Sequence, residues 1–208
     1  MIIRNEIKKR FPGHGIIGEE YGRENEESPI QWVLDPIDGT KSFIHGVPFY
    51  TTLIGVMIDN EPQVGIIYAP ALDEICTAAI GLGATFNGKP CRVRETDELK
   101  NATFLMTEIL RFQTCGMEKE FQELLQKTKL HRTWGDAYGH MMVAIGRADL
   151  MFDPELNIWD AAALLPVLKE SGGVFSDTNG VETIHTGNGY STNKALYPQV
   201  QAILDKYK

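Results

Sequence analysis

The chain contains 208 residues, of which 43% are hydrophobic and 23% are charged. A chain of this length and composition buries a large hydrophobic core, which predicts one compact unit with at most two lobes and excludes a mainly disordered protein. The formal net charge is −8, and the strongest basic run is Lys8-Lys9-Arg10. This balance argues against nucleic acid as a partner, because polyanions are bound through dense positive charge.

The cysteines and the apolar segments indicate the cellular compartment in which the protein is expected. Cys76, Cys91 and Cys115 are far apart in the sequence and form no C-x-x-C pair. Neither a disulfide framework nor a zinc site is therefore indicated. No apolar run approaches the roughly 20 residues needed to span a bilayer, and the N-terminus lacks the apolar core of a signal peptide. These features predict a soluble cytoplasmic protein with no membrane partner.

The first elements in chain order are a helix end and a short strand. Residues 1–10 have the pattern of the last turns of a helix, which Phe11-Pro12-Gly13 ends. Residues 31–34 predict a short apolar strand that runs into a loop at Asp35-Pro36-Ile37-Asp38-Gly39. Pro36 holds Asp35 extended, and Gly39 permits a sharp exit from this loop.

The remaining elements divide into two kinds. Residues 51–93 predict an antiparallel meander, with strands at 51–58, 64–68, 75–79 and 84–86 and a further strand after Asn87-Gly88. After about residue 98 strands alternate with helices, which are expected at 118–128, 137–145, 161–171 and 198–207. This change predicts a metal-loop lobe with an antiparallel sheet over residues 1–98 and an α/β lobe over residues 99–208.

The first cluster with chemical character is Asp35-Pro36-Ile37-Asp38-Gly39-Thr40. Two carboxylates and a free carbonyl on one rigid turn supply the oxygen ligands that magnesium prefers. If Gly39 and Thr40 open a short helix, their amides face a phosphate oxygen. Taken alone, however, Asp-Pro-x-Asp-Gly is also a common turn sequence.

Two further acidic clusters are weak when each is considered by itself. Gly18-Glu19-Glu20 follows the apolar pair Ile16-Ile17, and Asp160 lies in Trp159-Asp160-Ala161-Ala162 at the expected start of a helix. An acidic residue in the first turn of a helix is usually a cap. The three clusters therefore gain specificity only through their combination and order.

In that order the three clusters resemble the metal-binding motifs of the inositol monophosphatase superfamily. The resemblance covers essentially the whole chain, including Gly81-x-Gly83-Ala84 and Gly172-Gly173. It implies two or three magnesium ions, with the first held by Glu19, Asp35 and the Ile37 carbonyl and the second by Asp35, Asp38 and Asp160. It also implies catalytic roles for Thr40 and Glu19, with Thr40 orienting the attacking water.

The resemblance further implies an α-β-α-β-α layered α/β sandwich and a homodimer. Related chains carry additional helices at the front, with a Thr and an Asp that assist the threonine, and the present sequence is expected to lack them. Thr40 is then without its usual partner. A catalytically weak metal-binding or regulatory relative is the alternative of a different class.

The chemistry of phosphate esters agrees with a metal-dependent mechanism. A phosphate monoester dianion repels a nucleophile unless its charge is neutralised, which bound metals achieve. A covalent mechanism lacks support, because no cysteine lies in a phosphate-cradling loop and no histidine has a fixed relation to a nucleophile. His45 and His140 are expected to be packed, hydrogen-bonded residues, and Gly81-Leu82-Gly83 lacks the third glycine of a dinucleotide fingerprint.

Two segments bear on the substrate. Residues 39–48 and the Trp-Gly-Asp-x-Tyr-Gly segment at 134–139 look like the histidinol-phosphatase branch. Histidinol phosphate carries an ammonium group and an imidazole, so Asp136 and Asp153 are expected to pair with it, while Gly39 and Thr40 bind the phosphate. Inositol-1-phosphatase and 3′(2′),5′-bisphosphate nucleotidase remain alternatives, since Lys41 is shared with the latter branch.

Overall fold

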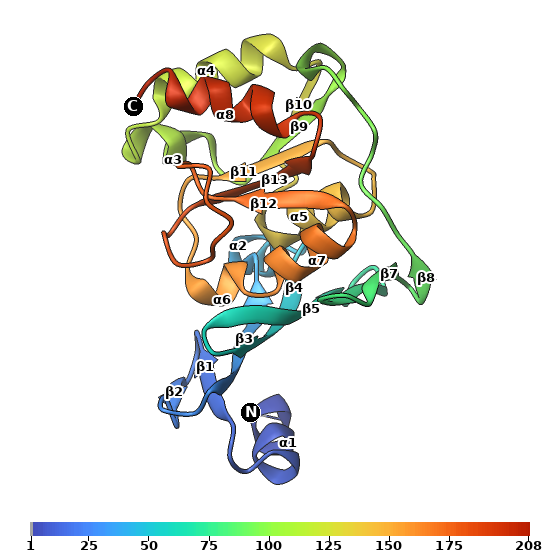
Figure 1. Cartoon of the computed structure of the whole chain (residues 1–208), viewed down its shortest axis with the longest axis vertical. Coiled ribbons are helices and arrows are strands. Elements are labelled where there is room, and N and C mark those ends of the chain that lie inside the picture. Colours follow the sequence, from blue (N-terminus) through green and yellow to red (C-terminus); the bar gives the residue numbers. More distant parts are fainter. Residues whose placement is uncertain (1) are drawn as a thin grey trace.

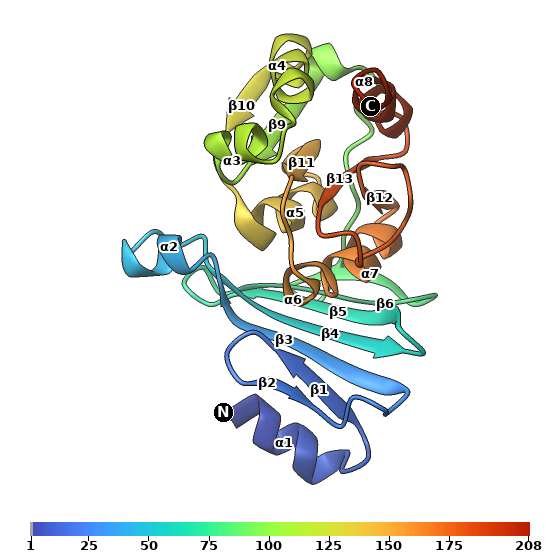
Figure 2. The same cartoon turned by 90° about the vertical axis from the view of Figure 1, so that its left-hand side faces the viewer.

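The computed structural model describes residues 2–208 and has an α-β-α-β-α arrangement of layers (Figures 1 and 2). Helix α1 (Ile2–Arg10) packs on the outer face of the first sheet. Helices α5 (Asp136–Ala144), α6 (Ile158–Ala161) and α7 (Leu164–Glu170) lie between the two sheets, as Figure 2 shows. Helices α3 (Ile109–Thr114), α4 (Glu118–Lys127) and α8 (Tyr197–Asp205) lie beyond the second sheet. The layering predicted from the sequence is confirmed.

The first sheet has eight strands in the order β2-β1-β3-β4-β5-β6-β7-β8. Its strands are β1 (Gly15–Gly18), β2 (Gly22–Glu24), β3 (Ile30–Asp38), β4 (Thr51–Ile58), β5 (Glu61–Ala69), β6 (Glu74–Ala79), β7 (Gly83–Phe86) and β8 (Lys89–Pro90). From β3 onward every neighbouring pair is antiparallel, which confirms the meander. Asp59 and Asn60 form its first hairpin turn at φ 52° and 67°, a left-handed geometry that these residue types tolerate.

The second sheet has five strands in the order β10-β9-β11-β13-β12. They are β9 (Thr103–Met106), β10 (Leu130–Arg132), β11 (Leu150–Asp153), β12 (Gly173–Ser176) and β13 (Gly189–Asn193). Strands β10, β9 and β11 are parallel, whereas β13 is antiparallel to both of its neighbours. The short helix α2 (Thr40–Ile44) and a 3₁₀ turn (Leu99–Asn101) complete the fold.

In each sheet, successive side chains point alternately into a central hydrophobic cluster between the sheets and into a separate outer cluster. In the first sheet Val33 faces the central cluster between the sheets, whereas Leu34 faces the cluster under α1. In the second sheet Leu105 faces the same central cluster, whereas Phe104 and Phe152 face the outer helices. Because the strand period is two, adjacent residues point to opposite faces, so both sheets are sandwiched. The central cluster draws residues from both halves of the chain.

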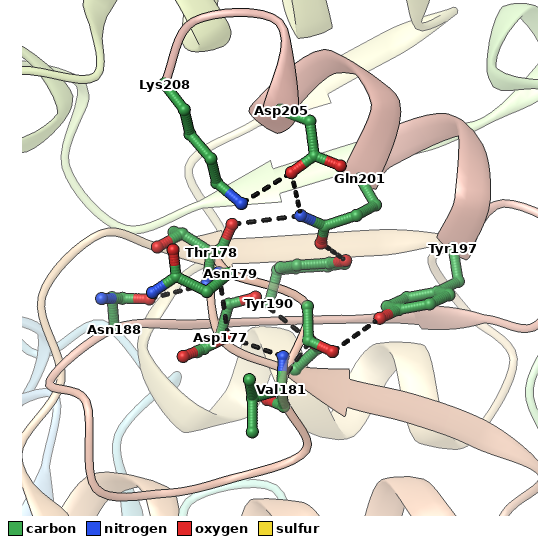
Figure 3. A network of polar contacts seen from close by, with 12 residues as sticks. Asp177, Thr178, Asn179, Val181, Asn188, Tyr190, Tyr197, Gln201, Asp205 and Lys208 are labelled. Carbon is green, nitrogen blue, oxygen red and sulfur yellow. Dashed lines mark hydrogen bonds and ion pairs between the residues drawn. The ribbon is translucent and has the colours of Figure 1, made fainter.

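Helix α8 is tied to the second sheet by polar contacts as well as by its apolar face (Figure 3). The Tyr190 hydroxyl on β13 donates a hydrogen bond to Gln201 at 2.8 Å, and Gln201 donates to the Thr178 carbonyl at 3.2 Å. The Tyr197 hydroxyl donates to the Gly180 carbonyl at 3.1 Å. These bonds fix the C-terminal helix and the segment after β12 to each other, on the side of the sheet away from the central layer.

Two sequence predictions about local structure are wrong. Strand β3 does not end at Leu34 but continues to Asp38, so Asp35 and Asp38 lie in a strand and not in a loop. The single helix expected at 161–171 is divided into α6 and α7, because Pro166 has no N–H to donate to the Ala162 carbonyl.

The remaining helices at 118–127, 136–144 and 197–205 match the prediction closely. The strand pair β1 and β2 and helix α3 were not predicted. The lobe boundary near residue 98 stays a prediction, with the whole first sheet formed by residues before it. None of the helices within residues 2–208 is both long and apolar enough to cross a membrane.

Candidate active site

A bulge in β3 brings the first two carboxylates to one side of the sheet. Asp35 pairs with Leu53 and Asp38 pairs with Thr51, so three residue steps along β3 lie opposite two steps along β4. In a regular strand, residues three apart point to opposite faces, and one extra residue reverses that relation. Asp35 and Asp38 therefore face the same point, although the sequence spacing alone does not require it.

The third carboxylate comes from the other half of the chain. Asp160 is the third residue of α6, where its carboxylate accepts a hydrogen bond from the Asn157 backbone N–H at 2.7 Å and forms a capping box with the Asn157 side chain. One oxygen from each of Asp35, Asp38 and Asp160 lies within 4.8 Å of the others. Glu19, in the turn between β1 and β2, lines the same cavity.

Hydrogen bonds fix the two buried aspartates. Asp38 accepts from the Thr51 hydroxyl at 2.9 Å and from the Ala137 backbone N–H at 2.8 Å, both on the same oxygen. Asp35 accepts from the Ile37 N–H at 2.9 Å. The bond from Ala137 also joins β3 to the start of α5, so this contact connects the first sheet to the helices of the middle layer at the site.

The electrostatics of the cluster are unfavourable for bare carboxylates. Burial raises the pKa of Asp35 to about 8, and the charges of Glu19 and Asp160 add to the effect. Burial also raises the pKa of Asp38 well above its usual value, with contributions from Asp136 and Asp35. The pKa of Asp160 is raised by burial to about 6, against the hydrogen bonds from Asn157.

These residues fit a divalent cation of the magnesium type. The donors are carboxylate oxygens without histidine or cysteine, which is the set that hard cations prefer. Like charges held together in a buried place repel one another, and a bound cation would offset that repulsion. Ile37 lies between the two aspartates in β3, and its carbonyl accepts a hydrogen bond from the Thr40 hydroxyl at 3.1 Å.

Helix α2 begins directly after the bulged strand. Gly39 precedes its first residue at φ 76°, a left-handed geometry that a side chain disfavours, and Thr40 opens the helix. Both line a cavity of about 620 Å³ that also contains the carboxylate cluster. The expected short helix is confirmed, and its first residues adjoin the acidic cluster.

Asp136 and Asp153, the expected substrate contacts, line the same cavity. Asp136 adopts φ 53°, and its backbone N–H donates a hydrogen bond to the Thr107 hydroxyl at 2.7 Å, directly after β9. Burial and the charge of Asp153 raise the pKa of Asp136 to about 6. Asp153 ends β11, is buried, and contacts His140 at 3.2 Å.

The sequence indicated Lys41 only as a residue shared between branches, and sequence reasoning missed the ion pairs at the rim of the cavity. Lys41 Nζ lies 3.1 Å from Glu108 Oε2, and Arg111 lies 2.7 Å from a carboxylate oxygen of Glu155. Arg111 also approaches Glu108 at 3.9 Å. Lys41 and Glu108, like Arg111 and Glu155, are distant in sequence, so no local motif predicts these two ion pairs. His140 is packed and hydrogen-bonded as expected, whereas His45 is exposed and only bonded to the Lys41 carbonyl.

The layered α-β-α-β-α fold with its acidic cavity is shared with solved structures and sequence relatives. The structure of an inositol monophosphatase from Anabaena (Nostoc) sp. PCC 7120 superposes with a TM-score of 0.91 at 32% identity, over 99% of this chain and 83% of that chain. A protein described as histidinol-phosphatase from Chlorobaculum parvum is 39% identical over 196 residues, covering 94% of this chain and 76% of the relative. One described as fructose-1,6-bisphosphatase/inositol-1-monophosphatase from Aquifex aeolicus is 35% identical, covering 99% and 78%.

The model of the inositol monophosphatase family matches residues 1–207. The chain therefore belongs to the inositol monophosphatase family and is a phosphoric monoester hydrolase. The superfamily resemblance inferred from the three acidic clusters is confirmed.

Proposed function

We propose that the protein hydrolyses histidinol phosphate in a magnesium-dependent reaction. The observation that carries this proposal is the charge balance of the cavity. Its two basic residues, Lys41 and Arg111, are both paired with glutamates of the rim, whereas within residues 2–208 neither Asp136 nor Asp153 forms an ion pair with a lysine or an arginine. A substrate whose organic part is cationic suits such a cavity better than a neutral or a doubly anionic one.

In this proposal Asp35, Asp38, Asp160 and Glu19 hold the magnesium ions together with the Ile37 carbonyl. When bound, the ions would neutralise the phosphate and lower the pKa of the attacking water. The amides of Gly39 and Thr40 bind phosphate oxygens, because they open α2 and have no partner inside the helix. The Thr40 hydroxyl and Glu19 orient the water. A cytoplasmic location and a homodimer stay predictions.

The proposed recognition of the organic part rests on charge. The ammonium and imidazole groups of histidinol phosphate would each pair with a carboxylate, and such charge-assisted hydrogen bonds contribute about 1.5–3 kcal/mol. The name of the Chlorobaculum parvum relative, histidinol-phosphatase, supports the same substrate. The Aquifex aeolicus relative favours inositol 1-phosphate or fructose 1,6-bisphosphate as the second candidate.

A substrate panel tests the proposal within one preparation. We expect the kcat/KM for histidinol phosphate to exceed those for inositol 1-phosphate, fructose 1,6-bisphosphate and adenosine 3′,5′-bisphosphate. The ratio of kcat/KM values between substrates is preferable to an absolute rate, because any loss of activity that affects all substrates equally cancels in the ratio. A higher kcat/KM for one of the other esters would overturn the substrate assignment, and absence of magnesium-dependent turnover of all four would favour a catalytically weak relative.

A further inference from the structure

A fully buried histidine connects the substrate cavity to the interior of the protein. His140 lies on α5 with no exposed surface, and both of its ring nitrogens have a partner. Nδ1 lies 2.6 Å from the Ser191 hydroxyl, and Nε2 lies 3.2 Å from Asp153 Oδ2. Of these residues only Asp153 lines the cavity.

The strand register explains why one imidazole bridges these two residues. Asp153 on β11 pairs with Gly189 on β13, and Ser191 pairs with Met151. Asp153 and Ser191 are therefore diagonal neighbours, and such neighbours lie roughly 7–8 Å apart on one face of a sheet. The ring of His140 descends from α5 between them. Phe175 on β12 packs against the ring, with a centroid distance of 5.9 Å.

The direction of the hydrogen bonds follows from the chemistry of the partners. An ionised carboxylate only accepts, so Nε2 carries the proton and donates to Asp153. Nδ1 shares the other hydrogen bond of the ring with the Ser191 hydroxyl. Within residues 2–208, the Asp153 carboxylate has no other hydrogen-bond partner in the protein. His140 therefore fixes one carboxylate oxygen of Asp153 and leaves the other, Oδ1, without a protein partner.

The same three residue types form the triads of serine hydrolases, but the arrangement here excludes that role. In a triad the serine is the residue that meets the substrate and the aspartate is remote from it. Here Ser191 has no exposed surface and the aspartate adjoins the cavity. The order is thus reversed, and the serine orients the ring instead of attacking a substrate.

We propose that His140 is a positioning residue for substrate selectivity: together with Ser191 it holds Asp153 so that its remaining carboxylate oxygen meets the cationic organic part of the phosphate ester. This inference rests on the proposed function for the identity of that organic part. To the proposed function it adds His140 and Ser191 as the residues that position the Asp153 carboxylate. Asp136 and His140 lie one turn apart on α5, so one helix serves both acidic contacts.

A double-mutant cycle tests the proposal with histidinol phosphate and with ethyl phosphate, whose organic part carries no cationic group. We expect His140→Leu and Asp153→Asn each to raise the KM for histidinol phosphate relative to ethyl phosphate, on the order of tenfold, the effect of one charge-assisted hydrogen bond. The kcat should change much less. The double variant should be no worse than Asp153→Asn alone, and His140→Gln, which keeps a donor, should recover most of the loss.

Multiplicative effects in the double variant would overturn the proposal, as would a His140→Leu effect that is equal for both substrates. His185→Leu, at an exposed histidine, is the matched control and should leave both substrates unchanged. If His140→Leu does not fold, Ser191→Ala should show a weaker shift in the same direction, and no shift would also overturn it. If the wild type prefers inositol 1-phosphate, the proposed function fails, and the same cycle run with that ester tests the positioning role separately.

Discussion

Asp38 is the residue at which the two halves of the protein meet. Its carboxylate takes one hydrogen bond from Thr51 on the adjacent strand and one from the backbone of Ala137 on a helix of the other half. It is nearly inaccessible, and the charges of Asp136 and Asp35 act on it. A carboxylate buried beside others in this way is costly unless a cation is bound, which favours a metal role over a purely structural one.

Asp136 is expected to control substrate choice and not the overall rate. If its carboxylate pairs with a cationic group, Asp136→Ala should cost about 1.5–3 kcal/mol in transition-state stabilisation for histidinol phosphate and much less for inositol 1-phosphate. The ratio of the two kcat/KM values, measured in one preparation, is the readout. Asp97→Ala removes an exposed acid outside the cavity and is the matched control. An equal loss on both substrates would contradict this role.

Glycines on β4 and β5 allow helices α6 and α7 to pack closely on the first sheet. A side chain at Gly65 on β5 would meet the Ala163 carbonyl oxygen at 2.2 Å, and one at Gly55 on β4 would meet Ala162 Cβ at 2.7 Å. The absence of a side chain lets the junction of the two helices lie directly on the strands. This contact sets the height of α6 above the sheet, and thereby the position of Asp160 relative to the aspartates of β3.

Gly65→Ala is therefore expected to destabilise the protein and to disturb the carboxylate cluster. The clash is with backbone atoms, so the cost should be that of overpacking, about 1–3 kcal/mol. Each kcal/mol corresponds to roughly 2–4 °C in melting temperature for a chain of this size. Gly13→Ala, where a side chain meets nothing within 4 Å, is the control. Equal melting temperatures for the two variants would show that the close contact between Gly65 and Ala163 does not contribute to stability.

The elements that could be predicted are those whose signal is local. The meander followed from alternating apolar residues and turn residues, and the three acidic clusters followed from short motifs. The bulge at Asp35 and Asp38 could not be predicted, because it exists only in the register between β3 and β4. The bond from Asp136 to Thr107 and the rim pair of Lys41 with Glu108 were missed for the same reason, since each joins residues distant in sequence.

The raised pKa values of the buried aspartates link the stability of the whole molecule to pH and to metal binding. The pKa of Asp35 is raised to about 8, so the metal-free folded state keeps a proton that the unfolded chain releases near pH 4. The folded state then binds more protons between about pH 4 and 8, and the contribution of Asp35 to stability falls as pH rises through that window. The raised pKa of Asp160 acts in the same direction up to about pH 6.

We therefore expect magnesium to raise the melting temperature more at pH 8 than at pH 5, because the cation binds ionised carboxylates and offsets their repulsion. Thermal denaturation with a chelator and with magnesium at both pH values measures this. Asp35→Asn removes the titrating group and should reduce both the decline in metal-free stability and the magnesium effect. A magnesium effect that is independent of pH and unaffected by Asp35→Asn would contradict this linkage.

The central claim is that the cluster of Asp35, Asp38 and Asp160 holds the metal ions that drive phosphate ester hydrolysis. The most direct test is the turnover of histidinol phosphate by chelator-treated wild type and by Asp38→Asn across a magnesium titration, with the fold of both checked by circular dichroism. We predict that wild-type activity is lost on chelation and restored by magnesium, and that the folded variant is slower on the order of a hundredfold or more at saturating magnesium. A folded Asp38→Asn that retains more than about a tenth of wild-type turnover, a loss of only about 1.4 kcal/mol, would contradict the claim.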